Sequence, residues 1–193
     1  MQKLYAFDAP RDANDDLPYP SFVNRNIYYD LYYGKPYDPG TFRAPPTFRV
    51  HPGYVPPDVL NVPGMLRCLW SERVVRGLMA VADLHAEVLR AAFITKGSKK
   101  VKFEQDYYFV VPLVNSRDVV DKIAPEEESG TPRFRVREGF VPPAPLFRAS
   151  KMFDLVVVTE PLAEVVRELR PTGSYLIPVN EVTSDVMPLP VWS

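Results

Sequence analysis

Two segments of this chain each run from apolar residues into a hydroxyl residue, then a glutamate, and then a helical pattern of apolar residues. The first covers residues 69–78 (LWSERVVRGL) and the second covers residues 157–166 (VVTEPLAEVV). The hydroxyl of Ser71 or Thr159 can accept hydrogen bonds from the free N–H groups of the first helical turn. The glutamate that follows places negative charge at the positive end of the helix dipole. These two starts predict two helices, but they contain no chemistry.

The apolar residues after the first start recur at helical spacing and predict one long helix over residues 72–92. His85 falls on the apolar face of that helix. We interpret it as a core histidine rather than a metal ligand, because no second ligand lies one turn away on the same stripe. The second start predicts a short helix over residues 160–169, with Pro161 in its first turn. Residues 171–173 (PTG) end it.

Four segments are rich in the aromatic and β-branched residues typical of strands: 107–114, 133–137, 154–158 and 175–179. The third is continuously apolar after Asp154, which predicts a strand buried on both faces. The second alternates, so Phe134 and Val136 share one face and three arginines the other. A solvated arginine face is favoured there over a site for phosphates or an acidic partner. Residues 115–123 are interpreted as a short helical turn.

Residues 1–64 hold 8 of the 11 tyrosines and 11 of the 22 prolines, with turns between very short extended pieces. So many aromatic residues would not stay solvated, which argues against disorder. We expect residues 1–57 to form a loop-dominated region packed on a core made by residues 58–193. The fold class predicted is therefore α+β: a small mixed β-sheet packed by one long and one short helix, with an irregular Tyr/Pro-rich N-terminal layer.

Composition argues against several classes of function but points to none. The net charge is −1, a balance that gives no indication of nucleic-acid binding, and no apolar run has the length of a membrane span. The single cysteine, Cys68, fits a reducing compartment, so we expect a cytoplasmic protein. The basic turn at residues 95–100 (TKGSKK) lacks phosphate-loop spacing and is interpreted as solvated. We expect no cofactor and no metal.

Several segments resemble the immunity protein 11 family of bacterial polymorphic toxin systems, a myxobacterial-type immunity protein family. The resemblance lies in residues 69–75, in residues 107–111 followed by Asn115 and Asp121, and in residues 153–160 with the helix and strand that follow. It covers roughly residues 58–180. The chain departs from the family pattern at Thr159 and Pro161, where a serine and a polar residue are expected.

The resemblance implies a cytoplasmic immunity protein that binds and neutralises a cognate toxin, which an adjacent gene would encode. Such a protein needs no catalytic residues, and a few desolvated aromatic and arginine side chains would dominate its interface. The tyrosines of the first region either cover the core or form this partner surface. Our predicted partner-binding residues are Tyr28, Tyr29, Asp30, Tyr32, Tyr33, Tyr37, Asp38, Glu126, Glu127 and Glu128.

Two other classes of function stay open on the sequence. An adaptor or chaperone for effector delivery by a secretion system would bind its partner away from the toxic site and leave toxicity intact. A small enzyme would need His51, His85 or Cys68 for activity, yet no catalytic motif surrounds any of them.

Overall fold

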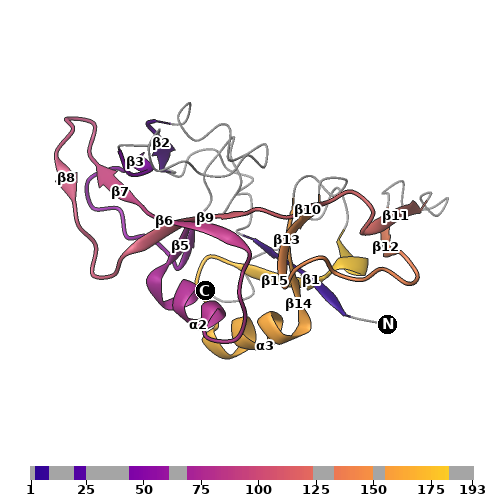
Figure 1. The fold of residues 1–193 in the computed structure, drawn as a ribbon. Helices are drawn as coiled ribbons and strands as arrows, with labels where there is room; N and C mark the ends of the chain where they lie inside the picture. Colours follow the sequence, from indigo (N-terminus) through magenta and orange to yellow (C-terminus); the bar gives the residue numbers. More distant parts are fainter. Residues whose placement is uncertain are drawn as a thin grey trace.

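The fold is α+β, and the described segments contain two helices and several small sheets. A computed structural model describes residues 3–8, 20–24, 44–60, 69–123, 133–149 and 155–182. The helices α2 (Glu72–Met79) and α3 (Glu160–Leu169) lie side by side on one side of the sheets (Figure 1). They approach closely, since a Cβ placed on Gly77 would lie 2.6 Å from Cδ1 of Leu169. The predicted fold class is confirmed.

The central sheet has five strands in the order β10-β13-β14-β1-β15. All neighbours are antiparallel except β10 and β13, so the sheet is mixed, as predicted. Its strands are β1 (Leu4–Asp8), β10 (Asn115–Ser116), β13 (Leu146–Ala149), β14 (Leu155–Thr159) and β15 (Tyr175–Pro178). The N-terminal strand β1 lies between β14 and β15 and so belongs to the core. The division of the chain at residue 57 stays a prediction.

The described segments form three further sheets. A four-stranded sheet has the order β4-β5-β9-β6, formed by β4 (Val59–Leu60), β5 (Leu69–Ser71), β9 (Tyr107–Pro112) and β6 (Ala86–Arg90). A second has the order β2-β3-β7-β8, formed by β2 (Ser21–Phe22), β3 (Thr47–Arg49), β7 (Ala92–Ile94) and β8 (Lys100–Val101). The strands β11 (Val120–Ile123) and β12 (Arg133–Val136) pair with each other, and η3 (Val179–Glu181) is a short 3₁₀ turn.

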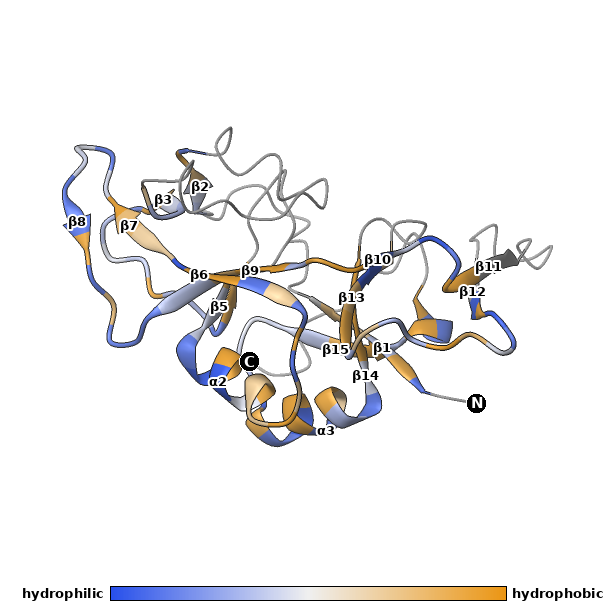
Figure 2. Ribbon diagram, in the orientation of Figure 1, coloured by the Kyte–Doolittle hydropathy of each residue, from blue (hydrophilic) through white to orange (hydrophobic). Residues whose placement is uncertain are grey.

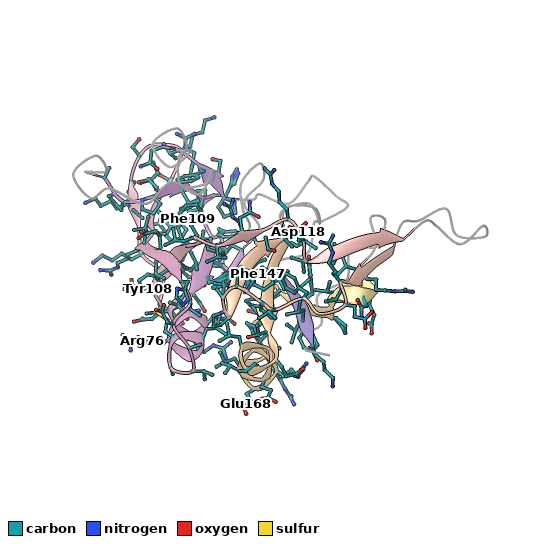
Figure 3. The ribbon with its side chains drawn as sticks, turned by 45° about the vertical axis from the view of Figure 1, so that its right-hand side comes forward. Arg76, Tyr108, Phe109, Asp118, Phe147 and Glu168 are labelled. Atoms are coloured by element: carbon teal, nitrogen blue, oxygen red, sulfur yellow. The ribbon has the colours of Figure 1, made fainter. Side chains whose placement is uncertain are left out.

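The buried apolar residues of the described segments form two clusters, and β1 and β14 separate them. Alternate residues of β14 face opposite clusters: Val156 and Val158 belong to the first, and Leu155 and Val157 to the second. Every residue of β14 is buried, which confirms the prediction made from its continuous apolar run. Figure 2 shows these strands as mostly hydrophobic, and Figure 3 shows Phe109 and Phe147 in the interior while Arg76 and Glu168 lie on the outer sides of the helices.

The predicted long helix over residues 72–92 is wrong beyond Met79. α2 ends at Met79, and the chain turns at His85, which has a left-handed φ of 47°. The turn is held by Asp83, whose carboxylate accepts from the His85 N–H at 3.0 Å. The following residues pair with β9 over five positions as β6, so strand pairing overrides the helical spacing. His85 is exposed, and its interpretation as a core histidine is therefore wrong.

Of the other predicted elements, some are confirmed and some are wrong. α3 has the predicted bounds, and the four predicted strand segments contain β9, β12, β14 and β15, although these lie in three different sheets. The predicted helical turn at 115–123 is wrong, because that segment forms the strands β10 and β11. In β12 the alternation is visible in exposed Arg135 beside buried Val136. Neither Ser71 nor Thr159 caps its helix through its side chain.

Ser98 offers a test of the turn between β7 and β8. Its φ of 61° is left-handed, a conformation that costs a side-chain-bearing residue roughly 1 kcal/mol relative to glycine. We expect Ser98→Gly to raise the free energy of unfolding by a few tenths to about 1 kcal/mol, measured by urea denaturation. Lys99→Gly is the control, since Lys99 has no positive φ and its replacement should lower stability. Equal effects of the two changes would contradict the turn geometry.

Candidate functional site

All ten predicted partner-binding residues lie outside the described residues. They are Tyr28, Tyr29, Asp30, Tyr32, Tyr33, Tyr37, Asp38, Glu126, Glu127 and Glu128. Cys68 also lies outside, whereas His51 and His85 are described and exposed. The described segments bring together no group of three or more histidine, cysteine, aspartate or glutamate side chains that could hold a metal ion.

Within the described residues, a dense polar cluster surrounds Asp58, which directly precedes β4 and is 6% exposed. The Ser71 hydroxyl donates to its Oδ1 at 2.8 Å, and Arg73 donates to its Oδ2 through Nη2 at 2.6 Å. Arg73 also donates through Nη1 to the Leu169 carbonyl at 2.7 Å, at the end of α3. The carboxylate therefore joins β4, the start of α2 and the end of α3.

Thr172 completes this cluster from the loop after α3. Its backbone N–H and its hydroxyl each lie 3.0 Å from Oδ2 of Asp58, and the Asp58 N–H lies 3.0 Å from the hydroxyl oxygen. Val59 donates to the Thr172 carbonyl at 3.1 Å. Residues that are 114 positions apart in sequence are thus hydrogen-bonded through both backbone and side chain.

The electrostatics of the cluster indicate a structural role. Burial alone would raise the pKa of Asp58, but the hydrogen bonds from Arg73, Ser71 and Thr172 outweigh it and lower the pKa from 3.8 to about 2. Burial raises the pKa of nearby Tyr107 to about 12, and its hydroxyl donates to the Pro56 carbonyl at 3.0 Å. At neutral pH both groups keep fixed protonation states. Both carboxylate oxygens accept from the protein itself, so Asp58 is not disposed to act as a base.

The lowered pKa predicts a pH dependence of stability. Because the folded-state pKa lies below the unfolded value, the contribution is fully present above about pH 4 and is lost as the pH falls through 3.8 towards 2. Its size is about 2 kcal/mol. We expect urea denaturation between acidic and neutral pH to show this loss in the wild type and not in Asp58→Asn. The exposed-site variant Asp106→Asn should keep it, and an unchanged acid dependence in Asp58→Asn would contradict the assignment.

A second polar group lies where β1 meets α3. The Tyr5 hydroxyl donates to Glu160 at 2.9 Å, Arg167 donates to the other carboxylate oxygen at 2.9 Å, and the guanidinium lies 4.5 Å from the centre of the Tyr5 ring. Partial burial opposes ionisation of Glu160, but the hydrogen bonds from Arg167 and Tyr5 hold its pKa below the ordinary value. This group fixes α3 against the central sheet.

A cleft of about 280 Å³ opens beside Tyr5. Its lining residues are Lys3, Leu4, Tyr5, Val136, Pro178, Val179 and Asn180. The Asn180 side-chain oxygen already accepts from the Val136 N–H at 2.8 Å. The walls are mostly apolar and bring no acid together with a base. The cleft therefore lacks the convergent polar groups that a reactive site needs.

The sequence missed the position of one charged surface. The basic turn at residues 95–100 is solvated, as predicted, but the sheet register places Arg49 on the same face as Lys100. Sequence spacing alone could not bring these residues together, because they come from strands about 50 positions apart.

Comparison with protein-family models and with curated proteins finds no match to this chain. The resemblance to the immunity protein 11 family therefore stays a prediction. Neither helix in the described part of the chain has the length and apolar content that crossing a bilayer requires.

Proposed function

We propose that this chain is a cytoplasmic immunity protein that neutralises a cognate bacterial toxin by direct protein–protein binding. One observation carries most of the support. The segments on which the resemblance rests form β5 with α2, β9, β14 with α3, and β15, and these elements pack around a shared interior. Ser71 and Arg73, from the first of these segments, donate to Asp58 and so hold the fold together.

This arrangement fits a family whose recognisable residues maintain a scaffold. The best-connected carboxylate, Asp58, is occupied by donors from the protein itself, so the polar chemistry of the interior serves folding. A binding protein then presents its partner surface elsewhere, where sequence is free of these packing demands. In this proposal the partner surface remains the predicted one, at Tyr28 to Asp38 and Glu126 to Glu128.

Co-expression with the product of the neighbouring gene tests the proposal. We expect the neighbouring product to be toxic alone, and we expect this chain to restore survival and to co-purify with it. Co-purification without rescue would favour the delivery adaptor. Rescue without a complex would favour an enzyme, and loss of rescue on replacing His51, His85 and Cys68 together would strengthen that alternative.

The predicted partner surface has its own test. We expect Tyr29→Ala with Tyr33→Ala to weaken the complex while leaving the melting temperature nearly unchanged, because rigid aromatic side chains concentrate binding energy at interfaces. The measurement pairs an affinity determination with thermal unfolding. A large loss of thermal stability would instead show that these rings cover the core.

A further inference from the structure

The sheet β2-β3-β7-β8 has one apolar and one basic face. Its register aligns Phe22, Phe48, Phe93 and Val101 in one row and Ser21, Arg49, Ile94 and Lys100 in the next. Adjacent rows point to opposite faces of a sheet. Since Phe48 and Phe93 are buried, Arg49 and Lys100 point outward, and both are exposed on either side of half-buried Ile94.

Three more lysines extend this surface along the β7–β8 hairpin. Lys96 and Lys99 lie in the turn and Lys102 follows β8, and all three are exposed. We call Arg49, Lys96, Lys99, Lys100 and Lys102 the basic face. Within the described segments none of the five forms an ion pair, and none pairs with the nearby acid Glu104. The hairpin projects at one end of the molecule, where Figure 2 shows its tip as hydrophilic.

Hydrogen bonds in the turn and ring packing on the inner side of the sheet hold the basic face in place. The turn is fixed by hydrogen bonds of 2.9 Å from Thr95 N–H to the Lys99 carbonyl and from Ser98 N–H to the Thr95 carbonyl. On the inner side, the Phe93 ring centre lies 4.8 Å from that of Phe103 and 5.8 Å from that of Tyr107. A partner would meet backbone positions that are already ordered, which lowers the entropic cost of binding.

Protection of a sheet edge is the plain alternative, because lysines on edge strands discourage aggregation. β8 is an edge strand, but it contains only Lys100 and Val101. Lys96 and Lys99 lie in the turn, and Arg49 lies on β3, which is paired on both sides by β2 and β7. Edge protection therefore accounts for Lys100 but does not explain the other positive charges in the turn and on β3.

We propose that the basic face docks an acidic polypeptide segment. A protein partner fits better than a nucleic acid. The aromatic rings of this sheet face inward, so no stacking platform accompanies the charges. The chain as a whole carries a net charge of −1, and the apolar side chain at the centre, Ile94, suits a polypeptide contact. Resting on the proposed function, the segment belongs to an acidic surface of the cognate toxin.

A pair of matched variants tests this docking. Lys99→Glu with Lys100→Glu reverses two charges on the basic face, and Arg117→Glu with Arg135→Glu reverses two exposed charges elsewhere, so both variants have the same net charge. Charge of either sign still protects an edge, so aggregation should not change. The probes are a labelled oligoglutamate peptide, a DNA duplex of similar length, and the purified toxin, each at low and at physiological ionic strength.

We expect the lysine variant to weaken oligoglutamate binding and slow toxin association by about tenfold at low salt, and the arginine variant to stay within about twofold. Equal losses in both variants, or tighter wild-type binding of the duplex than of the peptide, would overturn the proposal. If the wild type binds the peptide through the lysines but not the toxin, the docking stands and the proposed function fails. If the wild type binds the toxin and the lysine variant behaves like the wild type with both probes, the docking fails and the function stands.

Discussion

Asp58→Ala is expected to lower the free energy of unfolding by about 3–5 kcal/mol, at about 1.5–3 kcal/mol for each hydrogen bond to a charged group. The reason is that several donors lose their acceptor together. The Ser71 hydroxyl is fully buried, and the Thr172 N–H and the Arg73 guanidinium also donate to this carboxylate. Since domains of this kind are stable by only about 5–15 kcal/mol, the change removes a large part of the total.

Asp106→Ala is the matched control for this prediction. Asp106 also accepts from an arginine, Arg90 Nη2, at 2.7 Å, but its side chain is 39% exposed and that of Arg90 is 69% exposed. An exposed pair of this kind contributes about 0–1 kcal/mol. Chemical denaturation of both variants measures the difference. Similar losses for Asp58→Ala and Asp106→Ala would contradict the role given to the buried cluster.

Gly173→Ala has the second largest expected effect, about 2–4 kcal/mol of destabilisation. Gly173 follows Thr172 in the loop after α3 and has a φ of +71°. A Cβ there would lie 2.6 Å from Cβ of Pro57 and 2.7 Å from the Val59 carbonyl oxygen. Neither neighbour can rotate away, because one is a proline ring and the other is backbone of β4.

Gly53→Ala separates the two causes of this cost. Gly53 has a similar φ of +78°, but a Cβ there meets nothing within 4 Å. It should therefore lose only the roughly 1–2 kcal/mol of left-handed strain. Thermal or chemical unfolding of both variants gives the contribution of close packing by difference. Equal destabilisation would show that Pro57 and β4 can move away from the loop.

The elements that the sequence predicted best are those whose signals are local. α3 combines an apolar stripe, a proline in its first turn and a helix-ending loop, and its predicted bounds match the structure. The buried strand β14 is indicated by four consecutive apolar residues, Leu155 to Val158, directly before Thr159. Both are decided by residues adjacent in sequence, so tertiary context has little to change.

The errors arise where pairing partners are distant. Residues 86–90 have a spacing that suits a helix, yet their backbone hydrogen bonds go to β9 in the four-stranded sheet. Ser71 looked like a helix cap, but a carboxylate 13 positions earlier in the chain takes its hydroxyl instead. The basic face needed the register of β3 with β7 and of β7 with β8, which no sequence spacing contains.

The central claim is that this chain inhibits a toxin by stoichiometric binding, and titration of purified toxin activity with the purified chain tests it most directly. We predict that inhibition grows linearly and is complete at about one equivalent, because each complex occludes one toxin molecule. No inhibition by an excess of the folded chain would contradict the account. So would complete inactivation by a small fraction of an equivalent, which would show catalytic turnover rather than binding.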